Sequence, residues 1–69
     1  MQNQCDKMKS LLEELGLEIE TVKPVMTGIL IKTKEDWGQA IASAYLKEAG
    51  FKIVSKGFRN GFYEVLVKA

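Results

Sequence analysis

Apolar positions along the chain follow two spacings, one typical of helices and one typical of strands. The first segment has helical spacing, and its apolar stripe consists of Cys5, Met8, Leu12 and Leu15. Gly16 is expected to end this helix, because glycine accepts the left-handed backbone conformation found just past a helix C-terminus. Residues 17–21 then alternate between glutamates and less polar side chains, which predicts a half-buried strand.

The next segments predict a second strand and a second helix. Pro24 is expected to end the first strand, because proline has no N–H for the sheet ladder, and residues 26–33 supply the second strand. Residues 33–36 (Thr-Lys-Glu-Asp) carry the pattern of a capping box, which would begin a helix. The apolar stripe of this helix consists of Trp37, Ala40, Ile41, Ala44 and Tyr45, and Gly50 follows its end.

The last part of the chain predicts a hairpin of two strands, over residues 51–58 and 62–68. Asn60-Gly61 stands between them and is the strongest short-range signal for a tight hairpin turn. The hairpin brings the fourth strand back beside the third, so the two are expected to pair antiparallel.

The predicted fold is an α+β two-layer sandwich with the element order α-β-β-α-β-β. The second strand, the second helix and the third strand form a β-α-β unit, and the fourth strand fills the gap beside the second. The sheet order is then 1-2-4-3 with both helices on one face, a circular permutation of the ferredoxin-like arrangement. The side chains expected in the core are Met8, Leu12, Leu15, Leu17, Ile19, Ile29, Ile31, Trp37, Ile41, Tyr45, Phe51, Ile53, Tyr63, Val65 and Val67.

All residues, 1–69, are expected to form a single domain. Its two α-β-β halves, residues 3–33 and 34–69, share a weak similarity. The run Leu-x-Glu-Leu-Gly-Leu-Glu-Ile from Leu12 recurs as Leu-x-Glu-Ala-Gly-Phe-Lys-Ile from Leu46. An internal duplication explains this similarity, and so does the convergence of two α-β-β units on one pattern. The predicted fold does not depend on the choice.

The face of the sheet away from the helices is the predicted contact surface. Its apolar side chains make a patch of the kind that marks interfaces, and basic residues of the last hairpin border it. The residues expected to bind a partner are Leu30, Phe62, Leu66, Val54, Lys52, Lys56 and Arg59, and strict alternation places Val22 on the same face. The occupant is a second copy or a larger protein in one interpretation, and single-stranded nucleic acid stacked on Phe62 in another. A merely solvated face is the third.

Composition narrows the function classes. Apolar residues make up 46% and charged residues 28%, which argues against a disordered chain. The net charge of +1 is too small to draw nucleic acid or a membrane through a long-range field. The charge is uneven, because residues 1–20 hold two lysines and five carboxylates, and residues 50–69 hold four basic side chains and one glutamate. The two ends are expected to attract each other, within one molecule or between copies.

The chain lacks histidine and has one cysteine, Cys5. The commonest general base and metal ligand is therefore missing, and a lone cysteine forms neither an internal disulfide nor a Cys-rich zinc site. We expect no catalytic residues, no metal and no cofactor, in a cytoplasmic protein without a membrane span. The predicted function is a small non-enzymatic interaction module that self-associates or regulates a larger protein.

Residues 29–68 resemble the C-terminal half of the small sulfur-carrier proteins related to TusA and SirA. The shared features are a strand, Asp36 near a helix start, Gly50 at the helix end and a closing Phe-Tyr-Glu-Val-Leu-Val strand. That family's chemistry rests on a Cys-Pro-x-Pro motif at its first helix, whereas this chain reads Cys-Asp-Lys-Met over residues 5–8 and lacks the family's opening strand. The resemblance implies sulfur transfer by a Cys5 thiolate at a helix N-terminus. The competing interpretation is a small, inert core residue.

Overall fold

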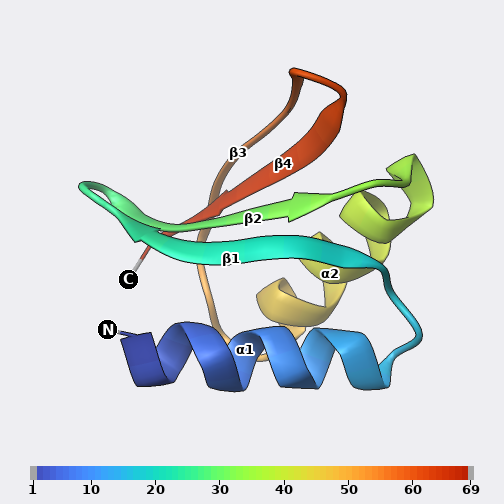
Figure 1. Cartoon of the computed structure of the whole chain (residues 1–69). Coiled ribbons are helices and arrows are strands. Elements are labelled where there is room, and N and C mark those ends of the chain that lie inside the picture. The colour runs from blue at the N-terminus through green and yellow to red at the C-terminus, as the bar shows by residue number, and fades with distance from the viewer. Residues whose placement is uncertain (1, 69) are drawn as a thin grey trace.

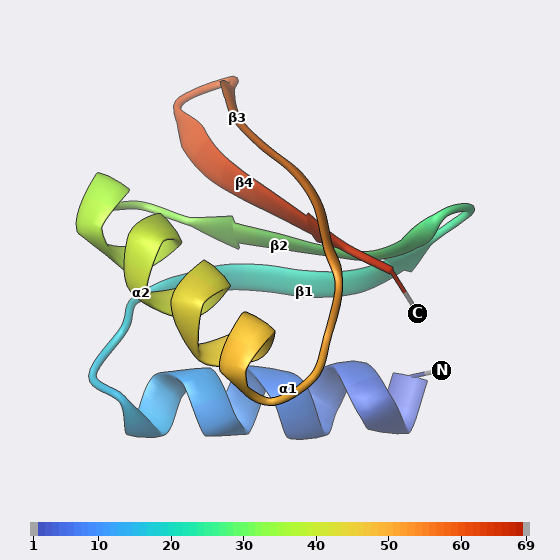
Figure 2. The same cartoon turned by 180° about the vertical axis from the view of Figure 1, so that it is seen from behind.

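Residues 2–68, which the computed structural model describes, form two helices and four strands in the predicted order (Figure 1). The elements are α1 (Gln2–Glu14), β1 (Ile19–Val25), β2 (Gly28–Thr33), α2 (Asp36–Glu48), β3 (Ile53–Arg59) and β4 (Phe62–Val67). The strands form one antiparallel sheet in the order β1-β2-β4-β3. Both helices lie on the same side of it, as the opposite view also shows (Figure 2). The predicted α+β sandwich with sheet order 1-2-4-3 is confirmed.

The first strand continues through Pro24, so the prediction that proline ends it is wrong. Pro24 lies opposite Ile29 inside β1. The strand tolerates it because β1 is an edge strand, and one side of its backbone needs no partner in the sheet.

A register shift between Ile19 and Thr21 adds a residue to β1. Val22 therefore lies opposite Ile31 and is buried, not on the face away from the helices.

The other edge strand, β3, has the same irregularity. Its register shifts between Ile53 and Ser55, so that Lys56 lies opposite the buried Val65. Strict alternation predicts Val54 and Lys56 on the face away from the helices. The extra residue instead places Val54 within the irregularity and turns Lys56 to the helical side of the strand. The prediction that Lys56 lies on the face away from the helices is therefore wrong, and Val54 has no partner in the regular register.

The hairpin between β3 and β4 has the predicted tight turn. Asn60 and Gly61 have φ angles of 53° and 82°, the left-handed pair that a two-residue hairpin turn requires. Beside the turn, the rings of Phe58 and Tyr63 lie 4.7 Å apart between centroids. The hairpin projects from the end of the sheet, well away from α1 (Figure 1).

The core lies between the sheet and the helices. It consists of Cys5, Met8, Leu12, Leu17, Ile19, Val22, Ile29, Ile31, Ala42, Leu46, Val65 and Val67. The central strands β2 and β4 supply four of these side chains, all fully buried. α1 packs chiefly against β1, whereas α2 packs against β4, β2 and β3.

The second helix buries a different stripe from the predicted one. Its buried residues are Gly38, Ala42, Ser43 and Leu46. Trp37 and Ile41, predicted in the core, are exposed, and so is Leu15, which lies just past the end of α1. Gly38 lies beside the end of β2, where an added Cβ would be in ordinary van der Waals contact, 3.5 Å from the Cβ of Thr33. Small residues let α2 lie close to the sheet, and the large ones next to them turn outward.

The capping box predicted at residues 33–36 is not formed. Glu35 is the N-cap of α2 and makes no side-chain capping hydrogen bond. The Thr33 hydroxyl instead donates to the carbonyl oxygen of Glu35 at 3.0 Å. Thr33 is fully buried, so this bond satisfies its hydroxyl while holding the strand-to-helix connection in place.

Candidate functional site

The sheet surface opposite the helices is called the open face below, and Leu30 and Leu66 lie at its centre. They are directly opposite each other on β2 and β4, and both are half-buried. Beside them is a hollow of about 300 Å³. The residues that line it are Val25, Thr27, Leu30, Ser55, Lys56, Gly57, Arg59, Glu64 and Leu66. Four of the seven predicted contact residues therefore meet at one depression.

The other three predicted contact residues lie outside the hollow. Phe62 is opposite Arg59 next to the hairpin turn and is half-buried. Val54 lies in the irregular part of β3 and is half-exposed. Lys52 precedes β3, and its carbonyl oxygen accepts a hydrogen bond from the N–H of Lys68 at 2.9 Å. An aromatic stacking platform on the open face would thus rest on Phe62 at its margin, away from the hollow.

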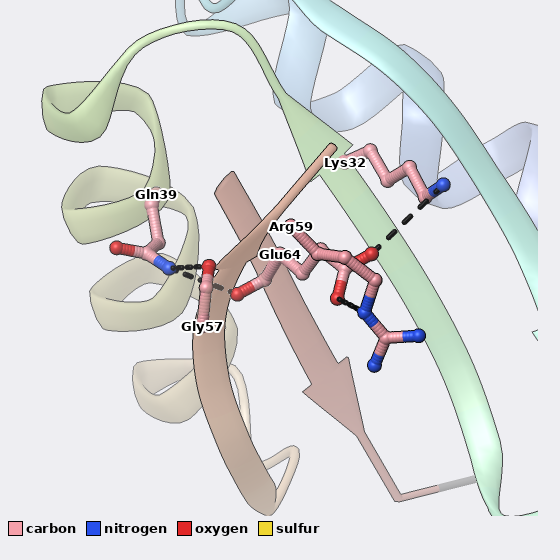
Figure 3. A network of polar contacts seen from close by, with 5 residues as sticks. All are labelled: Lys32, Gln39, Gly57, Arg59 and Glu64. Atoms are coloured by element: carbon pink, nitrogen blue, oxygen red, sulfur yellow. Dashed lines mark hydrogen bonds and ion pairs between the residues drawn. The ribbon is translucent and has the colours of Figure 1, made fainter. Parts of the chain in front are cut away.

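Two basic side chains, Lys32 and Arg59, flank the carboxylate of Glu64 on the open face (Figure 3). Its two oxygens lie 3.9 Å from Lys32 Nζ and 3.8 Å from Arg59 Nε. The Glu64 side chain is 13% exposed, and that of Arg59 is 74% exposed. Glu64 is therefore neutralised within the sheet, while most of the Arg59 guanidinium remains in contact with solvent and available to an outside carboxylate.

A glutamine of α2 fixes the hairpin that carries the hollow. Gln39 Nε2 donates to the backbone oxygens of Gly57 and Glu64, each at 2.9 Å (Figure 3). These two residues face each other on β3 and β4. One amide group thus joins the helix to both strands beneath the hollow. Sequence reasoning missed Gln39, because a single glutamine on a helix carries no signal of its tertiary partner.

The helical side carries a second depression, which sequence reasoning also missed. A groove of about 450 Å³ separates α1 from the end of α2. Its lining is mostly apolar and consists of Gln4, Lys7, Met8, Leu11, Tyr45, Leu46, Ala49 and Phe51. The depression lined by these residues is called the helical groove below. One sequence signal could have indicated it. The small residues of α2 lie on a different side of the helix from its large apolar residues, and the small ones face the sheet.

Cys5 is fully buried in the core beside α1's other inward residues. A sulfur carrier needs an accessible thiol, whereas this one is enclosed by packed side chains. Within residues 2–68, no group of three cysteine, aspartate or glutamate side chains gathers closely enough to hold a metal ion. The same part of the chain has no helix long and apolar enough to cross a membrane.

Comparison of the chain with protein-family models, curated proteins and solved structures found no match. The function is therefore inferred from the two surfaces themselves. The open face combines an apolar floor, a hollow and the exposed Arg59, and the lining of the helical groove is mostly apolar. Surfaces of these two kinds favour different partners.

Proposed function

We propose that this protein is a non-catalytic interaction module that binds a partner protein through the hollow of the open face. The observation that carries this proposal is the position of Leu30 and Leu66 next to the exposed Arg59 around one depression. An apolar anchor side chain fits such a hollow, and a polar rim surrounds the anchors of most protein interfaces. Both helices lie on the other side of the sheet, so no helix covers this surface.

The charges around the hollow indicate an acidic partner surface. The last 20 residues hold four basic side chains and a single carboxylate, Glu64. Glu64 is shared between Lys32 and Arg59, so one carboxylate cannot balance all of the basic side chains. Complementary charge at the rim of an interface speeds association and selects the partner. We infer a partner that presents an apolar side chain bordered by carboxylates.

Amide NMR titration with two blocked pentapeptides tests this proposal. One peptide has a central leucine between glutamates, and the other has the same leucine between lysines. We expect the acidic peptide to shift the amides around Leu30, Gly57 and Leu66, and the basic peptide to leave them unchanged. The affinity should fall with added salt, because exposed charges are screened.

Two variants sharpen the test. Arg59→Glu should abolish the shifts, whereas Lys34→Glu makes the same charge change on an exposed residue outside the hollow and should retain them. Equal shifts with both peptides, or none near the hollow, would contradict the proposal. Self-association of copies through this face is the competing occupant, and it would appear as a dimer that Leu66→Glu converts into a folded monomer.

A further inference from the structure

Four large apolar side chains of the helical layer are exposed to a similar degree. Leu11 and Leu15 at α1 are 39% and 44% exposed, and Trp37 and Ile41 of α2 are 47% and 43% exposed. Scattered apolar residues are normal on a protein surface, but contiguous apolar patches mark interaction sites. The question is therefore whether these four side chains form one surface.

Helical spacing relates all four to the walls of the helical groove. Leu11 of α1 and Tyr45 of α2 both line it. Residues four apart lie on the same side of a helix, so Ile41 and Trp37 lie one and two turns before Tyr45 on the same side of α2. Leu15 directly follows the last residue of α1, four residues after Leu11.

We propose that a second copy of this chain covers this surface, with the α1 helices of the two copies antiparallel across a two-fold axis near Leu11. The proposal is independent of partner binding at the open face, because it concerns the opposite layer of the molecule. A two-fold interface must be self-complementary, since each patch meets its own copy. The charges along α1 meet this condition.

Opposite charges flank Leu11 at almost equal distances. Lys7 precedes it by four residues and Glu14 follows it by three, and both side chains are exposed. In an antiparallel pair, Lys7 of each copy lies near Glu14 of the other, so two ion pairs form around the central leucines. A parallel pair would bring lysine against lysine and glutamate against glutamate. The sequence of α1 thus favours one orientation.

The helical layer is large enough for a stable interface. A stable dimer buries about 800 Å² per partner, which is less than a fifth of this protein's accessible surface of 4397 Å². In the proposed arrangement the interface extends from the helical groove towards Trp37, and the pair displays its two open faces on opposite outer sides.

Light scattering at graded concentrations under reducing conditions measures the association. We expect a dimer for the natural sequence and a folded monomer for the variant Leu11→Glu/Leu15→Glu, whose substitutions fall on exposed side chains and should not unfold the chain. Trp37 is the single tryptophan, so its fluorescence should shift to longer wavelength when the dimer is diluted. Amide NMR confirms that the monomeric variant remains folded.

Charge reversal tests the orientation. Lys7→Glu and Glu14→Lys should each raise the dimer dissociation constant several-fold, and the double variant should restore it, because the pairs re-form with exchanged signs. Lys7 and Glu14 are seven residues apart along α1, so they do not meet within one copy. Lys34→Glu is the control outside the interface.

Each other outcome overturns the proposal. A monomer at millimolar concentration excludes the dimer. A dimer that tolerates Leu11→Glu/Leu15→Glu but is lost in Leu66→Glu places self-association on the open face instead. A double charge variant that is weaker than both single variants excludes the antiparallel arrangement. Peptide binding at the open-face hollow is measured separately, and each proposal stands or fails without the other.

Discussion

The two α-β-β halves of the chain, residues 3–33 and 34–69, have the same order of elements but bury very different side chains. α1 buries Cys5, Met8 and Leu12, whereas most of what α2 buries is small. The strands differ in the same way, because β1 contributes Ile19 and Val22 to the core, while no residue of β3 is fully buried. The first half therefore supplies eight of the twelve core side chains, and the second half supplies four.

This contrast shows that element order and burial are separate properties of a sequence. In the second half, a glycine allows α2 to lie close to Thr33, and the larger residues of the helix turn outward. Both candidate surfaces include residues of this half, from β3 and β4 for the hollow and from α2 for the helical groove. The first half is expected to contribute more to stability, whereas both halves contribute residues to the two candidate surfaces.

Thiol labelling gives the largest expected difference between the halves. Cys5 is fully buried, so it should react with a thiol reagent on the order of 1,000-fold more slowly than a free cysteine, through global unfolding. A cysteine introduced in the second half, as Cys5→Ala/Ile41→Cys, should react at nearly the free rate at concentrations where the protein is monomeric. Rapid labelling of Cys5 in the folded protein would contradict this contrast and would favour the sulfur-carrier function.

Truncation of one apolar side chain in each helix measures the same contrast through the free energy of unfolding. Leu12→Ala should lower the free energy of unfolding by about 2–5 kcal/mol, because it removes a fully buried side chain and leaves a cavity. Ile41→Ala in the monomeric protein should change it by less than about 0.5 kcal/mol. Urea denaturation followed by circular dichroism measures both values. Similar losses for the two variants would mean that α2 is packed as tightly as α1.

Gln39 is the polar contact that joins α2 to the last hairpin. Gln39→Met keeps the length of the side chain but removes both hydrogen bonds, and should lower the free energy of unfolding by about 1–2 kcal/mol. Amide hydrogen exchange should also become faster in β3 than in β1. Gln4→Met makes the same change on an exposed residue of α1, and an equal loss there would show that the Gln39 contact has no special role.

Substitutions of Gly38 test the packing of α2 against the end of β2, with a small expected change in the free energy of unfolding. An alanine Cβ would lie 3.5 Å from Thr33, which is ordinary van der Waals contact, and alanine is the better helix former. Gly38→Ala should therefore stabilise the protein by about 0.5–1 kcal/mol. Gly38→Leu should destabilise it by about 1–3 kcal/mol, because a larger side chain forces α2 away from the sheet. Thermal unfolding of the two variants, which should move in opposite directions, checks the close approach.

The topology could be predicted from the sequence because its signals are local. The apolar spacing indicates each element, and Asn60-Gly61 requires a tight turn. The register shifts in β1 and β3 have no such signal, since a residue added to a strand depends on the pairing with its neighbour. Each shift moves the following side chains to the other face, so Val22 and Lys56 could not be placed by alternation.

The candidate site was predictable in part for the same reason. Leu30 and Leu66 belong to the regular central strands, and alternation correctly predicts that they share a face. The helical groove depends on which side of α2 faces the sheet, and the small residues Gly38, Ala42 and Ser43 are buried there together with Leu46. Periodicity alone favours Trp37 and Ile41 as the inward residues, because larger apolar side chains weigh more in any such pattern.

The irregular edges of the sheet have a consequence for how copies of this protein assemble. Pro24 interrupts the free backbone of one edge, and Lys56 and Arg59 place positive charge along the other, which also carries a register shift. A strand from another molecule finds no straight, uncharged run to extend at either edge. Addition of strand upon strand, the route to a fibril, is thereby discouraged. Association is left to the two broad faces, and a two-fold contact between faces is complete after a single pairing.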